Sequence, residues 1–331
     1  METNPIYKGK QISTIQDLSE ILNVEVNRIK HILYRANSFY IENPQPKDDG
    51  TMRMTYIIKP PLQQIQERIK DNIFSCVEFP HYLMGGIRDE ANPRDHIRNA
   101  KIHSGKKWLI SLDIKNYFPS IKNEYVYFMW RKFFGFSDEV SRVLTRLTTY
   151  NGFLPQGSKT SSGIANLLLW DKEPHFVDSL NKQDFVYTRF VDDITISSTK
   201  LVEKEMVSKI IVDMKHLLRQ YDLKLKGKKT KFQTRSQKMT VNKVTVNGKK
   251  PTISSEERNN IRLEVHLFEK KADNTKNWNE IDHDYYSLMG KLNYIKKVHS
   301  AYAEKLISRL EIKREEFYSK NYEKDGNGCR L

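Results

Sequence analysis

The sequence predicts an α+β protein, because short stretches with strand-like alternation stand among longer amphipathic helical stretches. Residues 187–197 alternate on both sides of Asp192 and Asp193, which predicts two short strands that turn at this acidic pair. Residues 108–113 form an apolar strand that ends on Asp113. From Glu256 onward the pattern is helical and basic. If the strand lies beside the hairpin, three carboxylates converge.

Composition sets the broad class of the protein. The chain has 331 residues, 38% hydrophobic and 29% charged, which is enough to bury a substantial core in one large domain or a few packed subdomains. Its formal net charge of +15 favours an anionic polymer as partner. Cys76 and Cys329 lie far apart, so we expect no disulfide framework or zinc site, and a reducing cytoplasm fits. We expect no signal peptide and no membrane span, since no run approaches about 18 apolar residues.

Helical periodicity is clear in the N-terminal third. Residues 14–22 and 26–34 predict two amphipathic helices. Such a pair can form a DNA-reading helix-turn-helix or a packing extension that braces the next subdomain, and we favour the extension. Residues 62–69 predict a further helix, whose apolar face comprises Leu62, Ile65 and Ile69.

The centre of the chain joins a helical region to a polar turn. Residues 123–150 are helical in pattern and rich in aromatic side chains. Residues 153–163 form a Gly-marked polar turn that leads into the apolar stretch 164–170. Gly and small hydroxyl residues before a helix allow the backbone to approach a bound nucleotide closely, although many ordinary helix starts look the same.

Beyond the acidic hairpin the pattern changes three times. Residues 202–220 predict an amphipathic helix, and residues 223–232 a basic strand. Residues 244–251 predict a hairpin, because Asn247-Gly248 supplies the positive φ angles of a tight primed turn.

The three carboxylates suit one kind of chemistry. Clustered carboxylates without nearby His or Cys favour hard cations such as Mg²⁺ over Zn²⁺. Such a cluster fits two-metal phosphoryl transfer, in which one ion activates the attacking hydroxyl and the other stabilises the leaving pyrophosphate. The alternative is that Asp192-Asp193 is a solvated turn, since Asp is common in turns.

The order of these segments resembles that of a reverse transcriptase, from about residue 47 to about residue 310. The match rests on five motifs in the family's order: an acidic motif at 112–118, a Leu-Pro-Gln-Gly motif at 154–158 with Asn166-Leu167, a Tyr-x-Asp-Asp motif at 190–193, a basic motif at Lys229-Thr230, and a primer-grip hairpin at Asn247-Gly248. Phe190 replaces the usual Tyr, which removes a hydroxyl but keeps the ring.

Resemblance to this family implies a right-hand polymerase. Its palm is an antiparallel sheet backed by helices, and fingers and a helical thumb flank the palm. The expected division of the chain is a helical extension over 1–46, fingers and palm over 47–255, a thumb over 256–320 and a flexible tail over 321–331.

The resemblance also implies roles for individual residues. Asp113, Asp192 and Asp193 would hold two Mg²⁺ ions, with Asp193 the weaker ligand. Phe118 would lie beneath the incoming sugar and exclude a 2′-hydroxyl, while Tyr117 points into the core. The expected nucleotide-binding residues also include Arg53 and its companion Lys47 on the triphosphate, Gln156 and Gly157 lining the pocket, and Lys229 at the departing pyrophosphate.

Residues 99–103 match the Asn-Ala-x-x-His signature of bacterial retron enzymes, which makes Asn99 and His103 candidate RNA-binding residues, with Lys291 in the thumb. Val241-Asn242-Lys243 departs from the Val-Thr-Gly triplet of those enzymes. A retron enzyme implies a cognate structured noncoding RNA as template and primer, an RNA–DNA product, and antiphage defence with an effector protein encoded nearby.

Two alternatives remain at this point. One is another defence-associated reverse transcriptase, with its own RNA or a protein primer. The other is a polymerase-shaped RNA-binding scaffold without catalysis. The three carboxylates argue against the scaffold, because binding RNA requires cations and does not require an acidic trio. The presence of Arg53, Gln156 and Lys229, which the resemblance places at the nucleotide, argues against it as well.

Overall fold

The computed structural model describes residues 3–47, 50–227 and 230–322, with side chains as far as residue 320. The chain forms two compact units. The first unit contains the residues up to Asn99 together with Lys106–Gln237. The second contains Ala100–Gly105 and the residues from Lys238 onward. The second unit therefore begins before the predicted thumb boundary at residue 256. None of the described helices is long and apolar enough to cross a membrane.

A five-stranded sheet organises the first unit, in the order β5, β7, β8, β6, β9. These strands are Leu83–Met84, Val186–Phe190, Asp193–Ser198, Trp108–Asp113 and Lys231–Thr234. β5 pairs with β7 in parallel, and the other pairs are antiparallel. The predicted acidic hairpin and the strand ending on Asp113 are confirmed. The predicted basic strand is shorter than expected, because β9 begins only at Lys231.

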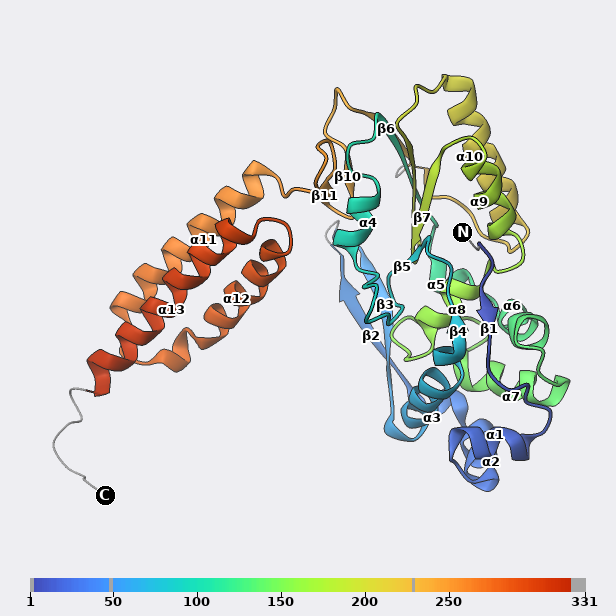
Figure 1. The fold of residues 1–331 in the computed structure, drawn as a ribbon. Helices are drawn as coiled ribbons and strands as arrows, with labels where there is room; N and C mark the ends of the chain where they lie inside the picture. The colour runs from blue at the N-terminus through green and yellow to red at the C-terminus, as the bar shows by residue number, and fades with distance from the viewer. Residues whose placement is uncertain (1–2, 48–49, 228–229, 323–331) are drawn as a thin grey trace. The chain divides into compact units, whose positions relative to one another are not determined.

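Helices cover the sheet of the first unit. α9 (Glu173–Asn181) packs on β7, and α10 (Lys204–Arg219) follows β8 along the chain (Figure 1). α10 confirms the amphipathic helix predicted over 202–220, and its buried side chains are Val207, Ile210, Met214, Leu217 and Leu218. β6 and β8 are buried along almost their whole length. β6 reads as a nearly continuous apolar run, whereas β8 keeps its alternation of Ile with Thr and Ser although both of its faces are covered.

The N-terminal helices form a packing extension. α1 (Ile15–Leu22) contacts α3 (Pro60–Asn72), and α2 (Val26–Tyr34) contacts α7 (Asp138–Thr148). Leu62, Ile65 and Ile69 of α3 are buried, as predicted. The hydroxyl of Thr14 accepts the Asp17 N–H in a capping box that begins α1. A 3₁₀ turn, η1 (Ala36–Phe39), leads out of the extension.

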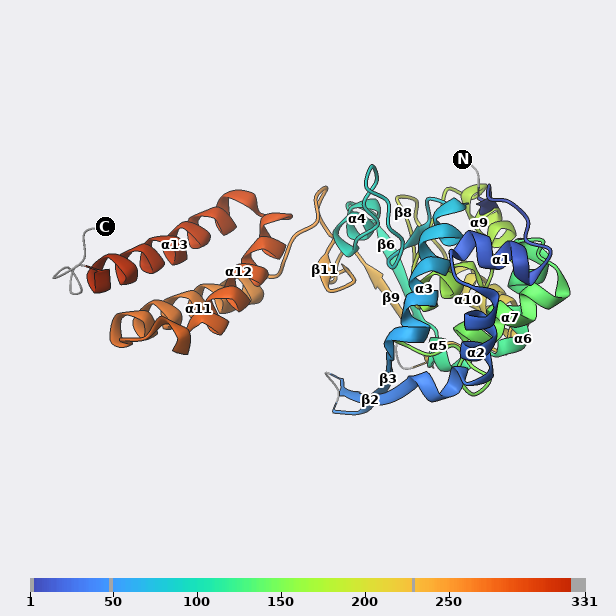
Figure 2. The same cartoon turned by 90° about the horizontal axis from the view of Figure 1, so that it is seen from below.

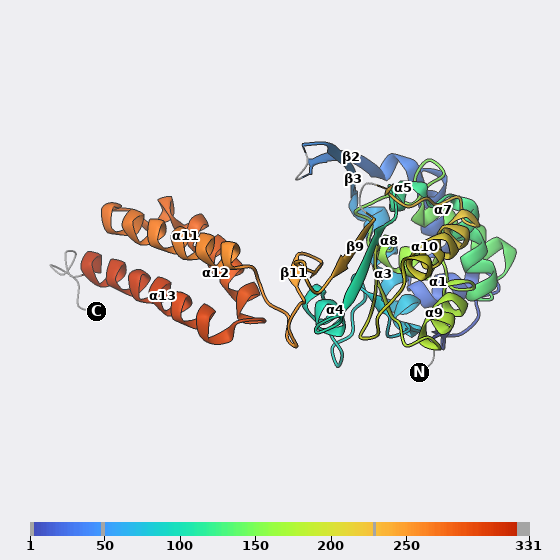
Figure 3. The ribbon, with the colours of Figure 1, turned by 90° about the horizontal axis from the view of Figure 1, so that it is seen from above.

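A two-stranded hairpin follows the extension. β2 (Tyr40–Pro46) pairs with β3 (Met52–Ile58) over its whole length, so the boundary predicted at residue 46 falls within the hairpin. Figures 2 and 3 both show this hairpin standing out from the rest of the first unit. A second small pairing joins β1 (Ile6–Tyr7) to β4 (Val77–Glu78), next to the 3₁₀ turn η2 (Phe74–Cys76).

The helical region predicted over 123–150 is interrupted. α6 (Asn123–Phe128) continues as a π-helical turn, η3 (Met129–Phe133), and the chain then turns at Gly135, whose φ is +72°. α7 begins only at Asp138, where the Ser137 hydroxyl caps it. The remaining helices of this unit's centre are short: α5 (Tyr117–Ser120) and α8 (Ser161–Leu167).

The second unit is a three-helix bundle preceded by a small hairpin. α11 (Ser255–Asn274), α12 (Asp282–Lys296) and α13 (Ser300–Tyr322) enclose their own core, with η5 (Trp278–Glu280) between the first two (Figure 1). The helical pattern predicted from Glu256 onward is confirmed. α4 (His96–Ile102) contains the point at which the chain passes from the first unit to the second.

The prediction of a tight turn at Asn247-Gly248 is wrong, because neither residue has a positive φ angle. β10 (Thr240–Val241) and β11 (Val244–Thr245) turn instead at Asn242 and Lys243, whose φ angles are +47° and +69°. The side-chain oxygen of Asn247 accepts a hydrogen bond from the Met239 N–H at 2.8 Å. The segment after β11 closes through a wider loop, in which Thr245 and Thr252 exchange two main-chain hydrogen bonds.

Candidate active site

Strand register places two of the three predicted carboxylates opposite each other. Asp113 at the end of β6 pairs with Asp193 at the start of β8. The next residue, Ile114, donates its N–H to the Asp192 carbonyl at 3.0 Å, so Asp113 and Asp193 occupy the closer, non-hydrogen-bonded kind of position. Side chains directly opposite share one face of a sheet, with Cβ atoms about 4.5–5.5 Å apart. Asp113 is buried, and the two hairpin residues are half-buried.

The turn that carries Asp192 is strained. Val191 has a φ of +58°, which is unusual for a β-branched residue and costs on the order of 1–3 kcal/mol. Its N–H donates to the Met84 carbonyl at 3.2 Å, which ties the turn to the end of β5. At Gly85 a Cβ atom would lie 2.8 Å from the ring of Phe190, so a side chain there would displace the aromatic residue of the motif.

The carboxylates suit a hard divalent cation. Like charges directly opposite on a sheet are destabilising unless a cation compensates them, and the available donors are all oxygens. Throughout the described part of the chain, no three His, Cys, Asp or Glu side chains converge as a ready-made metal cage. Mg²⁺ does not need one, because it keeps several waters and binds through one or two carboxylates plus substrate phosphates. The residues present therefore fit Mg²⁺.

Tyr117 and Phe118 differ as the sequence predicts. Tyr117 is buried, and its hydroxyl donates to the Ala165 carbonyl at 2.7 Å. The expectation that it points into the core is confirmed. Phe118 follows in the same short helix, is only half-buried, and meets the Tyr117 ring edge-on at a centroid distance of 6.1 Å. Part of the Phe118 ring therefore remains accessible to a ligand.

The polar turn predicted over 153–163 docks on β3. The Tyr56 N–H donates to the Gln156 carbonyl at 2.8 Å. Gly157 has a φ of +112°, and a Cβ atom there would lie 2.5 Å from the Tyr56 carbonyl oxygen. The next residue, Ser158, donates to Gln66, which also bonds Tyr40. Glycine is thus required at position 157 by close backbone approach.

Two of the predicted phosphate-binding cations, Arg53 and Lys47, belong to the β2–β3 hairpin. Arg53 is exposed on β3 opposite Gln45, three residues before the strand meets the Gln156 turn. Lys47 follows β2, and its N–H donates to the Thr51 carbonyl at 2.8 Å. Lys229 lies outside the described residues.

The basic segment also pairs with the strand of the first carboxylate. Lys226 is half-buried, and its main-chain N–H donates to the Asp113 carbonyl at 2.7 Å. The neighbouring Lys115 N–H bonds the Lys224 carbonyl in the same way. The basic segment therefore runs along the end of β6, next to the first carboxylate. A pairing between distant segments leaves no signal in local composition.

Comparison with known proteins agrees with this geometry. Residues 45–258 match the family described as reverse transcriptase (RNA-dependent DNA polymerase). The retron Se72 reverse transcriptase of Salmonella heidelberg is 33% identical over 275 residues, covering 81% of this chain and 71% of the relative. The retron Ec48 reverse transcriptase of Escherichia coli is 31% identical over 298 residues, covering 87% and 72%. The chain belongs to the retron-type reverse transcriptases.

A third relative extends over more of the chain. The retron Ec86 reverse transcriptase of Escherichia coli is 24% identical over 313 residues, which cover 94% of this chain and 92% of the relative. The present chain is therefore an RNA-directed DNA polymerase. Its fold class is the predicted right hand, of mixed helix and sheet. The predicted family is confirmed despite the departure at Val241-Asn242-Lys243. Enzymes with this domain use divalent metal ions.

The residues predicted to bind RNA differ in exposure. Asn99 and His103 are both completely buried, so neither side chain is exposed to an RNA surface in this structure. Lys291, on α12 of the second unit, is exposed and forms an ion pair of 2.6 Å with Glu264 of α11. An RNA phosphate at Lys291 would have to compete with this carboxylate.

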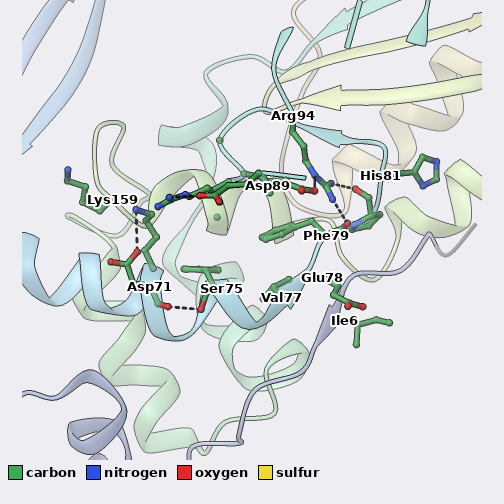
Figure 4. A pocket seen from close by; sticks show the side chains of 18 of the residues that line it. Ile6, Asp71, Ser75, Val77, Glu78, Phe79, His81, Asp89, Arg94 and Lys159 are labelled. Atoms are coloured by element: carbon green, nitrogen blue, oxygen red, sulfur yellow. Dashed lines mark hydrogen bonds and ion pairs between the residues drawn. The ribbon is translucent and has the colours of Figure 1, made fainter. Parts of the chain in front are cut away.

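The structure also contains a cavity of about 770 Å³ in the first unit (Figure 4). None of the described candidate residues lines it. Each Lys and Arg around it has an acidic partner: Lys70 with Asp71, Arg88 with Glu90, Arg94 with Asp89, and Lys159 with Glu67. Arg94 also donates to the carbonyls of Phe79 and Leu83. With its charges paired in this way, the cavity gives no reason to assign a charged ligand.

Proposed function

We propose that this retron-type reverse transcriptase copies a cognate structured noncoding RNA into DNA, with Asp113, Asp192 and Asp193 holding two Mg²⁺ ions. The observation that carries the proposal is the register that sets Asp113 opposite Asp193, with Asp192 in the adjoining turn. When bound, the two ions activate the primer hydroxyl and stabilise the leaving pyrophosphate. The chain's part is to hold three carboxylates at the end of a rigid sheet.

The incoming deoxynucleotide is proposed to bind between the β2–β3 hairpin and the palm. Arg53 binds the triphosphate through its planar guanidinium, with Lys47 beside it. Gln156 and Gly157 line the pocket. This assignment is supported by the main-chain hydrogen bond from Tyr56 to Gln156, since Tyr56 and Arg53 lie on the same strand.

Two further residues complete the proposed nucleotide site. Phe118 selects deoxynucleotides, because a half-buried ring beneath the sugar leaves no room for a 2′-hydroxyl. Lys229 neutralises or protonates the departing pyrophosphate. Its support is the sequence motif, and the pairing of the same basic segment with the end of β6.

The RNA partner is proposed from the chain's charge and its relatives. A net charge of +15 favours a polyanion. We propose that synthesis starts from an internal 2′-hydroxyl of the cognate RNA, which leaves DNA covalently joined to RNA. We also propose that the enzyme acts in antiphage defence with an effector protein encoded nearby. The support for both is the relationship to retron enzymes.

The experiment compares wild type with Asp192→Asn, each purified from cells that carry the native locus. Bound nucleic acid is extracted and treated separately with RNase and DNase. The matched control is Asp222→Asn, which changes the same chemical group at a solvent-exposed ion pair with Lys122 and should cost little stability. DNA is expected with wild type and Asp222→Asn and absent with Asp192→Asn.

Each outcome separates the candidate functions. DNA joined to RNA supports priming from a 2′-hydroxyl, whereas DNA without attached RNA points to another priming mode. Equal RNA recovery from all three proteins, without DNA and without incorporation of labelled deoxynucleotides, would leave an RNA-binding scaffold. In cells that carry the locus, phage plating should rise with Asp192→Asn, and unchanged plating would remove the defence role.

A further inference from the structure

A fully buried charge lies directly behind the acidic turn. Arg189 of β7 precedes the Phe190–Asp193 motif and is 0% exposed. Its guanidinium forms two parallel bonds with Glu173 of α9, from Nε to Oε1 at 2.6 Å and from Nη2 to Oε2 at 2.7 Å. Glu173 is 1% exposed and also accepts the Tyr187 hydroxyl at 2.6 Å. A buried ion pair of this kind is weak evidence for stability, because removing two charges from water offsets their attraction.

The remaining guanidinium hydrogens reach main-chain carbonyls. Nη2 donates to Asn166 at 2.9 Å, and Nη1 donates to Ala165 at 3.3 Å. Both carbonyls belong to the last turn of α8, where helical carbonyls lack intrahelical partners. Nη1 also donates to the Val191 carbonyl at 3.0 Å. Arg189 therefore joins the helix after the Gln156 turn to the turn that carries Asp192.

The contact with Val191 fixes a specific peptide group. The carbonyl of Val191 and the N–H of Asp192 lie in one peptide plane. Arg189 holds this plane, and the Ile114 N–H holds the next plane through the Asp192 carbonyl at 3.0 Å. The Val191 N–H is tied to Met84 as well. A Val with φ of +58° persists only when its surroundings enforce that conformation.

We propose that Arg189 is a positioning residue of the polymerase reaction, with Glu173 as its anchor: its bond to the Val191 carbonyl sets the direction of Asp192. This rests on the proposed role of Asp192 and deepens it. Arg is suited to the task and Lys is not, because only the planar fork bonds a carboxylate and several carbonyls at once.

The test compares Arg189→Met, Glu173→Gln, the double variant and Arg189→Lys. For each we would measure the unfolding midpoint, kcat, the KM for deoxynucleotide and the Mg²⁺ concentration at half-maximal rate on a synthetic template and primer. The single neutralising variants should be destabilised, since each leaves one buried charge without its partner. The double variant should regain most of the midpoint, but its kcat should remain at least about tenfold below wild type and its Mg²⁺ requirement should rise.

Arg189→Lys keeps the test decisive if the other variants fail to fold. It retains the charge beside Glu173 but cannot also hold Val191, so a folded protein with lowered kcat and raised Mg²⁺ requirement is expected. The matched control is Tyr187→Phe, which removes one bond to Glu173 and no bond to the turn. It should lower the midpoint and leave kcat unchanged.

Two results would overturn the proposal: a double variant that regains both stability and kcat, or an Arg189→Lys variant with wild-type kcat and Mg²⁺ dependence. Either would reduce the pair to a structural role. Asp192→Asn, measured alongside, separates this from failure of the proposed function. If Asp192→Asn retains kcat, the role of Asp192 fails first. If it is inactive while the Arg189 variants are normal, only the inference about Arg189 fails.

Discussion

Gly157→Ala tests whether the docking of the polar turn on β3 builds the nucleotide site. The added Cβ would lie 2.5 Å from the Tyr56 carbonyl oxygen, and φ is +112°. Forcing an L-residue to positive φ costs about 1–2 kcal/mol. Moving the turn away from β3 also forfeits the Tyr56–Gln156 hydrogen bond, worth about 0.5–1.5 kcal/mol. The total of about 1.5–3.5 kcal/mol corresponds to a loss of roughly 10–400-fold in kcat/KM.

The matched control is Gly152→Ala. Gly152 has a φ of +86°, but a Cβ there would meet nothing within 4 Å, so it carries the backbone cost without the clash. The assay is steady-state incorporation of one deoxynucleotide, with the unfolding midpoint measured for both variants. Gly157→Ala should lose kcat/KM chiefly through KM, and Gly152→Ala should lose only stability. Values of kcat/KM within about twofold of each other would refute the reasoning.

Three other substitutions probe separate parts of the site. Phe118→Ala should raise ribonucleotide incorporation relative to deoxynucleotide by at least about tenfold, as measured by competitive incorporation, whereas the exposed Phe128→Ala should not; equal selectivity would remove Phe118 as the gate. Val191→Gly should change the unfolding free energy by less than about 2 kcal/mol in denaturant titration, because relief of strain offsets chain entropy, yet kcat should fall. Gln66→Leu removes the hydrogen bonds that Gln66 makes with Ser158, Tyr40 and the Leu147 carbonyl, and should cost about 2–4 kcal/mol of stability in denaturant titration.

Local pattern was sufficient for most of the elements. The helices α3 and α10 bury the positions that their periodicity indicates, and the acidic hairpin turns where two Asp residues interrupt the alternation. The motif order was also visible, since it needs only sequence. What local pattern could not give was pairing. Neither the register that sets Asp113 against Asp193 nor the bond from Lys226 to Asp113 has a signature in either segment alone.

The hairpin of the second unit shows a conflict between turn preference and packing. Asn-Gly is the best local turn former, whereas Lys243 has no preference for positive φ. The turn nevertheless forms at Asn242-Lys243, because pairing Val241 with Val244 buries both side chains almost completely. Burial of two Val side chains contributes about 1.5–3 kcal/mol each, which exceeds the cost of one unfavourable φ. The side-chain oxygen of Asn247 instead accepts the Met239 N–H.

The burial of Arg189 is another feature that local sequence pattern does not indicate. Arg is almost never fully buried unless its charge is paired, and the partner Glu173 lies outside the strand. β7 is covered by α9, and Tyr187, Thr188 and Arg189 are buried in succession. A buried guanidinium needs acceptors for all its hydrogens, and Glu173, α8 and the Val191 carbonyl together supply them. The bonds of Arg189 therefore converge on the turn of Asp192, and no local pattern in β7 indicates them.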